Sequence, residues 1–113
     1  MTQIERIKKM EQILDEATSA VSELANALEK YRASISSLKA LSSYYEGGAW
    51  FADYNDDQAG KIPHDLKRGV LSEDAVWNLL SDNDEALDIM KRILNEANAK
   101  NADANDNEKS LQN

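Results

Sequence analysis

The chain has 113 residues and a net charge of −8, with one histidine and no cysteine. This length is typical of a single domain. The lack of cysteine excludes disulfides, thiolate nucleophiles and thiolate-bound metals, and the acidic excess argues against direct nucleic-acid binding, which needs a dense basic face. We find neither an apolar run near the ~20 residues of a membrane span nor a secretion signal, so we expect a cytoplasmic protein without membrane contact.

Residues 3–46 show one continuous helical pattern. Apolar side chains recur at spacings of three and four, and neither glycine nor proline interrupts them. This predicts a helix of about 40 residues, roughly 60 Å long at 1.5 Å per residue. A row of this period packs against another helix in a coiled coil or a bundle. The row, named the N-terminal seam, consists of Ile7, Met10, Leu14, Ala17, Val21, Leu24, Leu28, Tyr31, Ile35 and Leu38.

The middle of the chain combines turn residues with most of the aromatic side chains. Gly47-Gly48 predicts the end of the first helix, because glycine adopts the left-handed cap conformation at little cost. Residues 49–56 fit a short helix, and residues 55–60 read as a turn. The aromatic set is Tyr44, Tyr45, Trp50, Phe51, Tyr54 and, further along, Trp77. We favour a plug that packs this loop against the helices. A partner-binding patch remains the alternative, as does a mixture in which Tyr44 or Phe51 stays exposed.

A short basic segment lies between two acidic ones. Residues 61–71 carry a net charge of +2, whereas residues 44–60 carry −4 and residues 72–98 carry −5. A helix N-terminus attracts anions, which makes Lys67, Arg68 and Ser72 a candidate anion loop. However, Glu73 and Asp74 would repel an anion there, so we favour internal pairing between the basic and acidic loops.

The C-terminal half predicts two shorter helices. Ser72 has the character of an N-cap for a helix over residues 73–81, with Glu73 and Asp74 in its first turn. Asp82 and Glu85 have the spacing of a capping box, which predicts a break and another helix over residues 83–98. Because the apolar residues stay in one phase across the break, a single kinked helix over 73–98 is the alternative. The Asn-rich residues 99–113 predict a disordered tail outside a single helical domain of residues 1–98.

The predicted fold is therefore all-α, with one long helix packed against two shorter ones. Residues 73–98 would extend at most about 39 Å as helix, too little to cover the first helix. The seam around Ile7, Met10, Leu14 and Val21 would stay exposed, which predicts a homodimer or a complex with another helical protein. No metal-ligand set, cofactor motif or activated nucleophile is visible, and His64 lies in a loop without a nucleophile motif. We therefore expect no catalytic activity and no bound cofactor.

Several residues resemble a known family. They are Tyr44-Tyr45, Trp50, Asp53-Tyr54, Gly60, Pro63 and the run Asp65-Leu66-Lys67-Arg68-Gly69-Val70-Leu71-Ser72-Glu73-Asp74, followed by Leu79-Leu80. Over residues 4–95 the chain resembles the small bacterial proteins grouped as the domain of unknown function 4298 family. In that family a glycine and a tyrosine often stand where this chain has Ala75 and Trp77. The resemblance implies a mostly helical, cytoplasmic, bacterial protein, with no activity, cofactor or catalytic residue to transfer.

Three functions remain after these observations. The favoured one is a non-enzymatic protein–protein interaction or adaptor module that uses the N-terminal seam. The first alternative is a small-ligand or anion-binding regulator acting through the Lys67–Ser72 loop. The second is an acidic protein that occupies another protein's nucleic-acid site by mimicry, which the charge of residues 72–98 permits.

Overall fold

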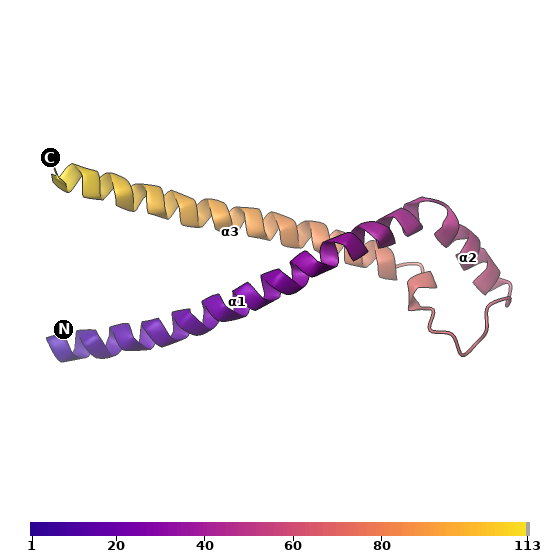
Figure 1. Cartoon of the computed structure of the whole chain (residues 1–113), viewed down its shortest axis with the longest axis horizontal. Coiled ribbons are helices and arrows are strands. Elements are labelled where there is room, and N and C mark those ends of the chain that lie inside the picture. Colours follow the sequence, from indigo (N-terminus) through magenta and orange to yellow (C-terminus); the bar gives the residue numbers. More distant parts are fainter. Residues whose placement is uncertain (113) are drawn as a thin grey trace. The chain divides into compact units, whose positions relative to one another are not determined.

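The computed structural model describes the backbone of residues 1–112 and the side chains of residues 1–101. Over that backbone it contains three α-helices, α1 (Gln3–Glu46), α2 (Ala49–Gln58) and α3 (Ala75–Gln112), and the 3-10 helix η1 (Gly69–Leu71) (Figure 1). No strand occurs in residues 1–112, so the all-α prediction is confirmed. The chain divides into two compact units, Met1–Ala40 and Leu41–Asn113.

The first unit consists of most of α1, a single uninterrupted helix with the predicted bounds. Thr2 and Glu5 close its N-terminus. The backbone N–H of Glu5 donates to Thr2 Oγ1 at 3.2 Å, and the backbone N–H of Thr2 donates to Glu5 Oε2 at 3.1 Å. This reciprocal pair is a capping box. None of the side chains of α1 is buried, so the helix presents its apolar row to the surroundings.

The second unit begins with the end of α1 and turns sharply into α2. The backbone N–H of Gly47 donates to the Ser43 carbonyl at 2.9 Å, and a Cβ at position 47 would lie only 2.7 Å from that oxygen. Gly48 has a φ of 92°, a conformation that costs other residues about 1–2 kcal/mol. The first glycine therefore provides space and the second provides the left-handed turn, which confirms the predicted helix end.

A short irregular loop joins α2 to α3. α2 runs to Gln58, further than residue 56, and Gly60 ends it with a φ of 76°. The backbone N–H of Leu66 donates to the Pro63 carbonyl at 3.2 Å and makes a turn before η1. Among the described side chains of this unit two are buried, Leu71 at 7% exposure and Val76 at 3%. They place the small core where η1 meets the start of α3.

α3 starts later than predicted, and Ser72 does not cap it. The Ser72 hydroxyl donates to the Gly69 carbonyl at 2.8 Å and so closes the η1 turn. The helix begins at Ala75, and its first backbone bond joins the Asn78 N–H to the Asp74 carbonyl at 2.8 Å. Glu73 therefore precedes the helix and does not lie in its first turn.

α3 also lacks the break that was predicted between two shorter helices. It is continuous through residues 81–85. The alternative of a single kinked helix over 73–98 is therefore correct in its continuity, but the helix runs from Ala75 to Gln112. A break would leave backbone groups without partners, and continuing the helix keeps Leu80, Leu87 and Met90 in one apolar stripe. The side chains of residues 102–113 lie outside the described residues. The backbone is helical to Gln112, and the disordered tail over residues 99–113 stays a prediction.

Candidate functional site

Three aromatic rings pack together where α1 turns into α2. We name these rings, Tyr45, Trp50 and Tyr54, the aromatic plug. Trp50 meets Tyr45 edge-on at 64°, and it lies nearly parallel to Tyr54 at 16°, with a centroid distance of 5.0 Å in each pair. Trp50 and Tyr54 are neighbours because residues four apart share one face of a helix. The indole Nε1–H of Trp50 donates to the Val70 carbonyl at 2.7 Å. Trp50 therefore connects α2 to η1.

Carboxylates accept the hydroxyl hydrogens of two tyrosines in this unit. Tyr44 donates to Asp53 Oδ2 at 2.7 Å, which joins the end of α1 to α2. Tyr54 donates to Glu73 Oε1 at 3.0 Å, which joins α2 to the residues before α3. These bonds show that both the polar atoms and the rings of the aromatic residues hold the loop in place.

The Tyr44 hydroxyl should ionise only at high pH. Burial, the hydrogen bond to Asp53 and the charge of Asp53 together raise the pKa of Tyr44 from 10.0 to about 12. The hydrogen bond to Glu73, followed by burial, raises the pKa of Tyr54 as well. Because the folded pKa of Tyr44 exceeds the unfolded value, the stability linked to it is fully present below pH 10 and is lost as the pH rises toward 12.

An ultraviolet absorbance titration of tyrosinate formation checks this expectation. The intact chain should show late tyrosinate absorbance that decreases in Tyr44→Phe and moves to lower pH in Asp53→Asn. The raised pKa of Tyr54 accounts for the late absorbance that remains in Tyr44→Phe. A late transition that Asp53→Asn leaves unchanged would contradict the role given to Asp53.

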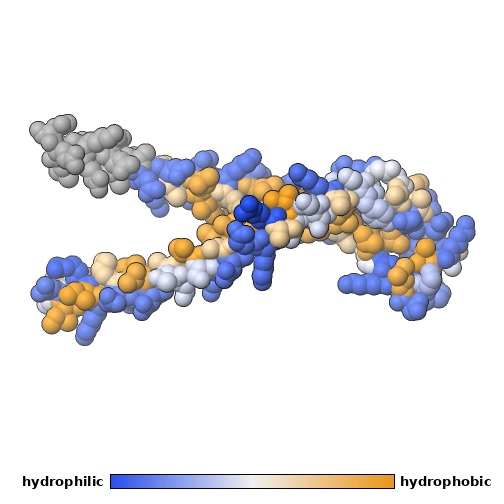
Figure 2. Space-filling model, in the orientation of Figure 1, coloured by the Kyte–Doolittle hydropathy of each residue, from blue (hydrophilic) through white to orange (hydrophobic). Residues whose placement is uncertain are grey.

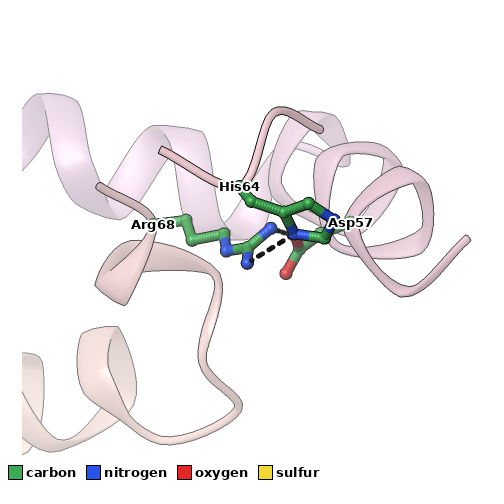
Figure 3. Close-up of polar contacts among 3 residues, drawn as sticks. All are labelled: Asp57, His64 and Arg68. Carbon is green, nitrogen blue, oxygen red and sulfur yellow. Dashed lines mark hydrogen bonds and ion pairs between the residues drawn. The ribbon is translucent and has the colours of Figure 1, made fainter. Parts of the chain in front are cut away.

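The basic loop pairs with the acidic helix α2, as favoured from the sequence. Arg68 Nη1 lies 2.8 Å from Asp57 Oδ1, and these side chains are only 33% and 16% exposed. Arg68 Nη2 lies 3.5 Å from Nδ1 of His64 (Figure 3). Lys61 and Asp56 form a second, more open pair at 3.9 Å. The guanidinium thus links the loop to α2 through charge and hydrogen bonding.

The candidate anion loop is largely occupied by these internal contacts. Arg68 binds Asp57, and the Ser72 hydroxyl binds the Gly69 carbonyl. A shallow hollow of about 330 Å³ lies beside them, lined by Tyr54, Asp57, Gln58, Arg68, Leu71, Ser72 and Glu73. Its lining contains two carboxylates and one guanidinium, so its net charge disfavours an anion.

Phe51 and Trp77 stand apart from the plug. Phe51 is 62% exposed, in agreement with the mixed interpretation of the aromatic set. Trp77 lies on α3 and is 60% exposed, so the prediction that it joins the plug was wrong. Val76 takes the buried position instead, and adjacent helical residues point about 100° apart. The structure thus brings together Tyr45, Trp50 and Tyr54, while Phe51 and Trp77 stay on the surface.

The N-terminal seam is exposed along α1, where Figure 2 shows hydrophobic side chains. Among its residues, Ile7 is 52% exposed, Leu14 58% and Val21 66%. From the sequence, this exposure was expected because residues 73–98 would form a helix too short to cover α1. That premise was wrong, because α3 has 38 residues and extends about 57 Å rather than 39 Å. The exposed fractions of these side chains now support the seam as a candidate surface in place of that argument.

The comparisons with known proteins give a family and nothing further. Within the described side chains, no group of three histidine or carboxylate residues could hold a metal ion, and none of the described helices has both the length and the apolar character of a membrane span. No curated protein and no solved structure matches the chain. The model of the family described as Domain of unknown function (DUF4298) matches residues 7–107, which is most of the chain. The protein therefore belongs to the DUF4298 family, as the residues of its middle segment indicated.

Proposed function

We propose that the chain is a non-enzymatic protein–protein interaction module whose N-terminal seam packs against a helix of a partner. The observation that supports this is the exposure of a regular apolar row on α1, with Ile7, Met10, Leu14 and Val21 each more than half exposed. Exposed apolar rows of this kind mark interaction surfaces. Burying them contributes roughly 25 cal/mol per Å² of apolar area.

The middle of the seam favours a helix as the partner. Ala17, Thr18, Val21, Ser22 and Ala25 line a shallow hollow on α1. Small side chains let another helix approach closely. The Thr18 hydroxyl donates to the Leu14 carbonyl at 2.6 Å, so it is already satisfied within α1 and needs no partner in an interface.

The charges beside the seam are compatible with a helical partner, including a second copy. Residues 1–43 carry six basic and six acidic side chains, so neither sign excludes self-association. The anion-binding alternative has less support, because Arg68 and Ser72 both have internal partners. We therefore place the functional surface on α1 and not on the Lys67–Ser72 loop.

A pair of matched double variants tests the seam. Leu14→Glu with Val21→Glu places two charges on it, whereas Ser19→Glu with Asn26→Glu places the same charges on the other side of α1. Sedimentation equilibrium measures self-association, and a photo-crosslinker at position 21 in the native cell reports a heterologous helix. We expect the seam variant to weaken association by roughly 30-fold or more, as for a loss above 2 kcal/mol at an interface, and the control variant to associate normally.

Two results would argue against the seam. One is a chain that stays monomeric at high concentration and gives no crosslink at position 21. The other is equal weakening in both double variants, since that would reflect added charge or lost helix and not a specific surface. Circular dichroism of each variant shows whether α1 is retained.

A further inference from the structure

Trp77 stands on a polar side of α3, away from the small core. Val76 beside it is 3% exposed, whereas Trp77 is 60% exposed. Steps of four, three and four residues from Trp77 along α3 reach Ser81, Asp84 and Asp88, which share one side of the helix. All three are exposed. We name the row formed by Trp77, Ser81, Asp84 and Asp88 the Trp77 ridge.

The ridge lies in the most one-sided charge segment of the chain. Residues 69–90 contain no basic side chain and six acidic ones, which are Glu73, Asp74, Asp82, Asp84, Glu85 and Asp88. All six are exposed. Within the described side chains none of them takes part in an ion pair, and Glu73 accepts only the neutral Tyr54 hydroxyl. The ridge thus combines an exposed indole with carboxylates that form no ion pair within the described side chains.

The two tryptophans of the chain are used differently. Trp50 has two ring neighbours and a hydrogen bond from its indole nitrogen. Trp77 has none of these contacts within the described side chains, and its ring is 60% exposed. Tryptophan is strongly enriched among the residues that dominate binding energy at interfaces. Trp77 therefore has the properties of an anchor for a partner.

The charge around Trp77 decides which partner fits. A second copy docked through the same ridge would bring Asp84 and Asp88 against the same carboxylates of the first copy, which is repulsive. Nucleic acid and an anionic membrane surface are repelled for the same reason. A segment of basic protein is attracted, because a guanidinium or ammonium group stacks on an indole face and also pairs with carboxylates.

We propose that the Trp77 ridge binds a basic, partly apolar segment of another protein. An arginine or lysine of that segment stacks on Trp77, and further basic side chains pair with Asp84 and Asp88. This surface belongs to the second unit of the chain, so the inference does not depend on the proposed use of the N-terminal seam. Two separate surfaces on one small chain suit an adaptor.

Nuclear magnetic resonance of the full chain tests the ridge with a built-in control. The probe is a short peptide of alternating arginine and leucine. We expect the indole N–H signal of Trp77 to shift on titration. The indole N–H signal of Trp50 should not shift, because that N–H is hydrogen-bonded to the Val70 carbonyl. A peptide with glutamine in place of arginine should not bind, and salt should weaken the arginine peptide.

Variants then separate specific binding from attraction to net charge, with affinity measured by the fluorescence anisotropy of a labelled peptide. Trp77→Ala should weaken binding roughly 30-fold, as for an interface anchor. Asp84→Asn with Asp88→Asn should weaken it by about five- to tenfold, whereas Glu11→Gln with Glu23→Gln on α1 should have little effect. All five substituted positions are exposed, so the variants should fold.

Several outcomes would overturn the proposal. They are a shift of Trp50 equal to that of Trp77, unchanged affinity in Trp77→Ala, and equal weakening in the two double variants. Binding of the glutamine peptide, or no binding of the arginine peptide even at low salt, would do the same. The seam variant Leu14→Glu with Val21→Glu should bind the peptide normally, which keeps this test distinct from the test of the seam.

Discussion

Trp50→Ala is expected to lower the free energy of unfolding of the second unit by about 3 kcal/mol, the low end for removing a large aromatic side chain. The low end applies because Trp50 is half-buried. The variant loses two aromatic contacts, worth about 0.5–1.5 kcal/mol each beyond burial. It also loses the hydrogen bond to the Val70 carbonyl, worth about 1 kcal/mol where water can replace it.

Two neighbouring substitutions separate these contributions. Trp50→Phe keeps an aromatic ring and removes the N–H, so it should cost about 1 kcal/mol. Phe51→Ala removes the adjacent but 62% exposed ring and should change stability by less than about 0.5 kcal/mol. Urea unfolding followed by circular dichroism measures all three. If Phe51→Ala lowered the free energy of unfolding as much as Trp50→Ala, the stabilising aromatic contacts would not be those of Trp50.

The long helix and its end could be predicted from sequence because both depend on local chemistry. An uninterrupted period of three and four residues specifies α1, and Gly47-Gly48 specifies where it stops. The capping box of Thr2 and Glu5 fixes the start of α1, and it was not part of the prediction from sequence. The break in α3 was predicted wrongly because Asp82 and Glu85 have capping chemistry. Capping residues are tolerated inside a helix when the apolar phase continues on both sides.

The contacts of the candidate site were less predictable because they join residues through an irregular loop. The charges of residues 44–60 and 61–71 predicted internal pairing, but nothing in the sequence selects Asp57 as the partner of Arg68. The acceptor for Trp50 is the backbone carbonyl of Val70, which has no signature of its own. Trp77 was assigned to the plug because it is aromatic like the other members. On the helix, however, its neighbour Val76 faces the core and is the buried residue of the two.

Removing the guanidinium group of Arg68 is the second change with a large expected effect. Arg68→Met keeps the length of the aliphatic stem and leaves Asp57, 16% exposed, without its partner. A carboxylate in that position loses a charge-assisted hydrogen bond, so we expect a cost of about 1–3 kcal/mol. The loop of residues 61–71 should become accessible to proteolysis, because its link to α2 is gone.

The Lys61–Asp56 pair provides the matched control. It joins the same loop to the same helix, but at 3.9 Å and with side chains 70% and 52% exposed, so Lys61→Met should cost less than about 0.5 kcal/mol. Arg68→Lys should recover only part of the loss, since an ammonium group lacks the forked geometry that a carboxylate accepts. In a double-mutant cycle with Asp57→Asn, a coupling energy near zero would show that the two side chains do not stabilise each other. Arg68 would then be available for the anion that the internal pair now disfavours.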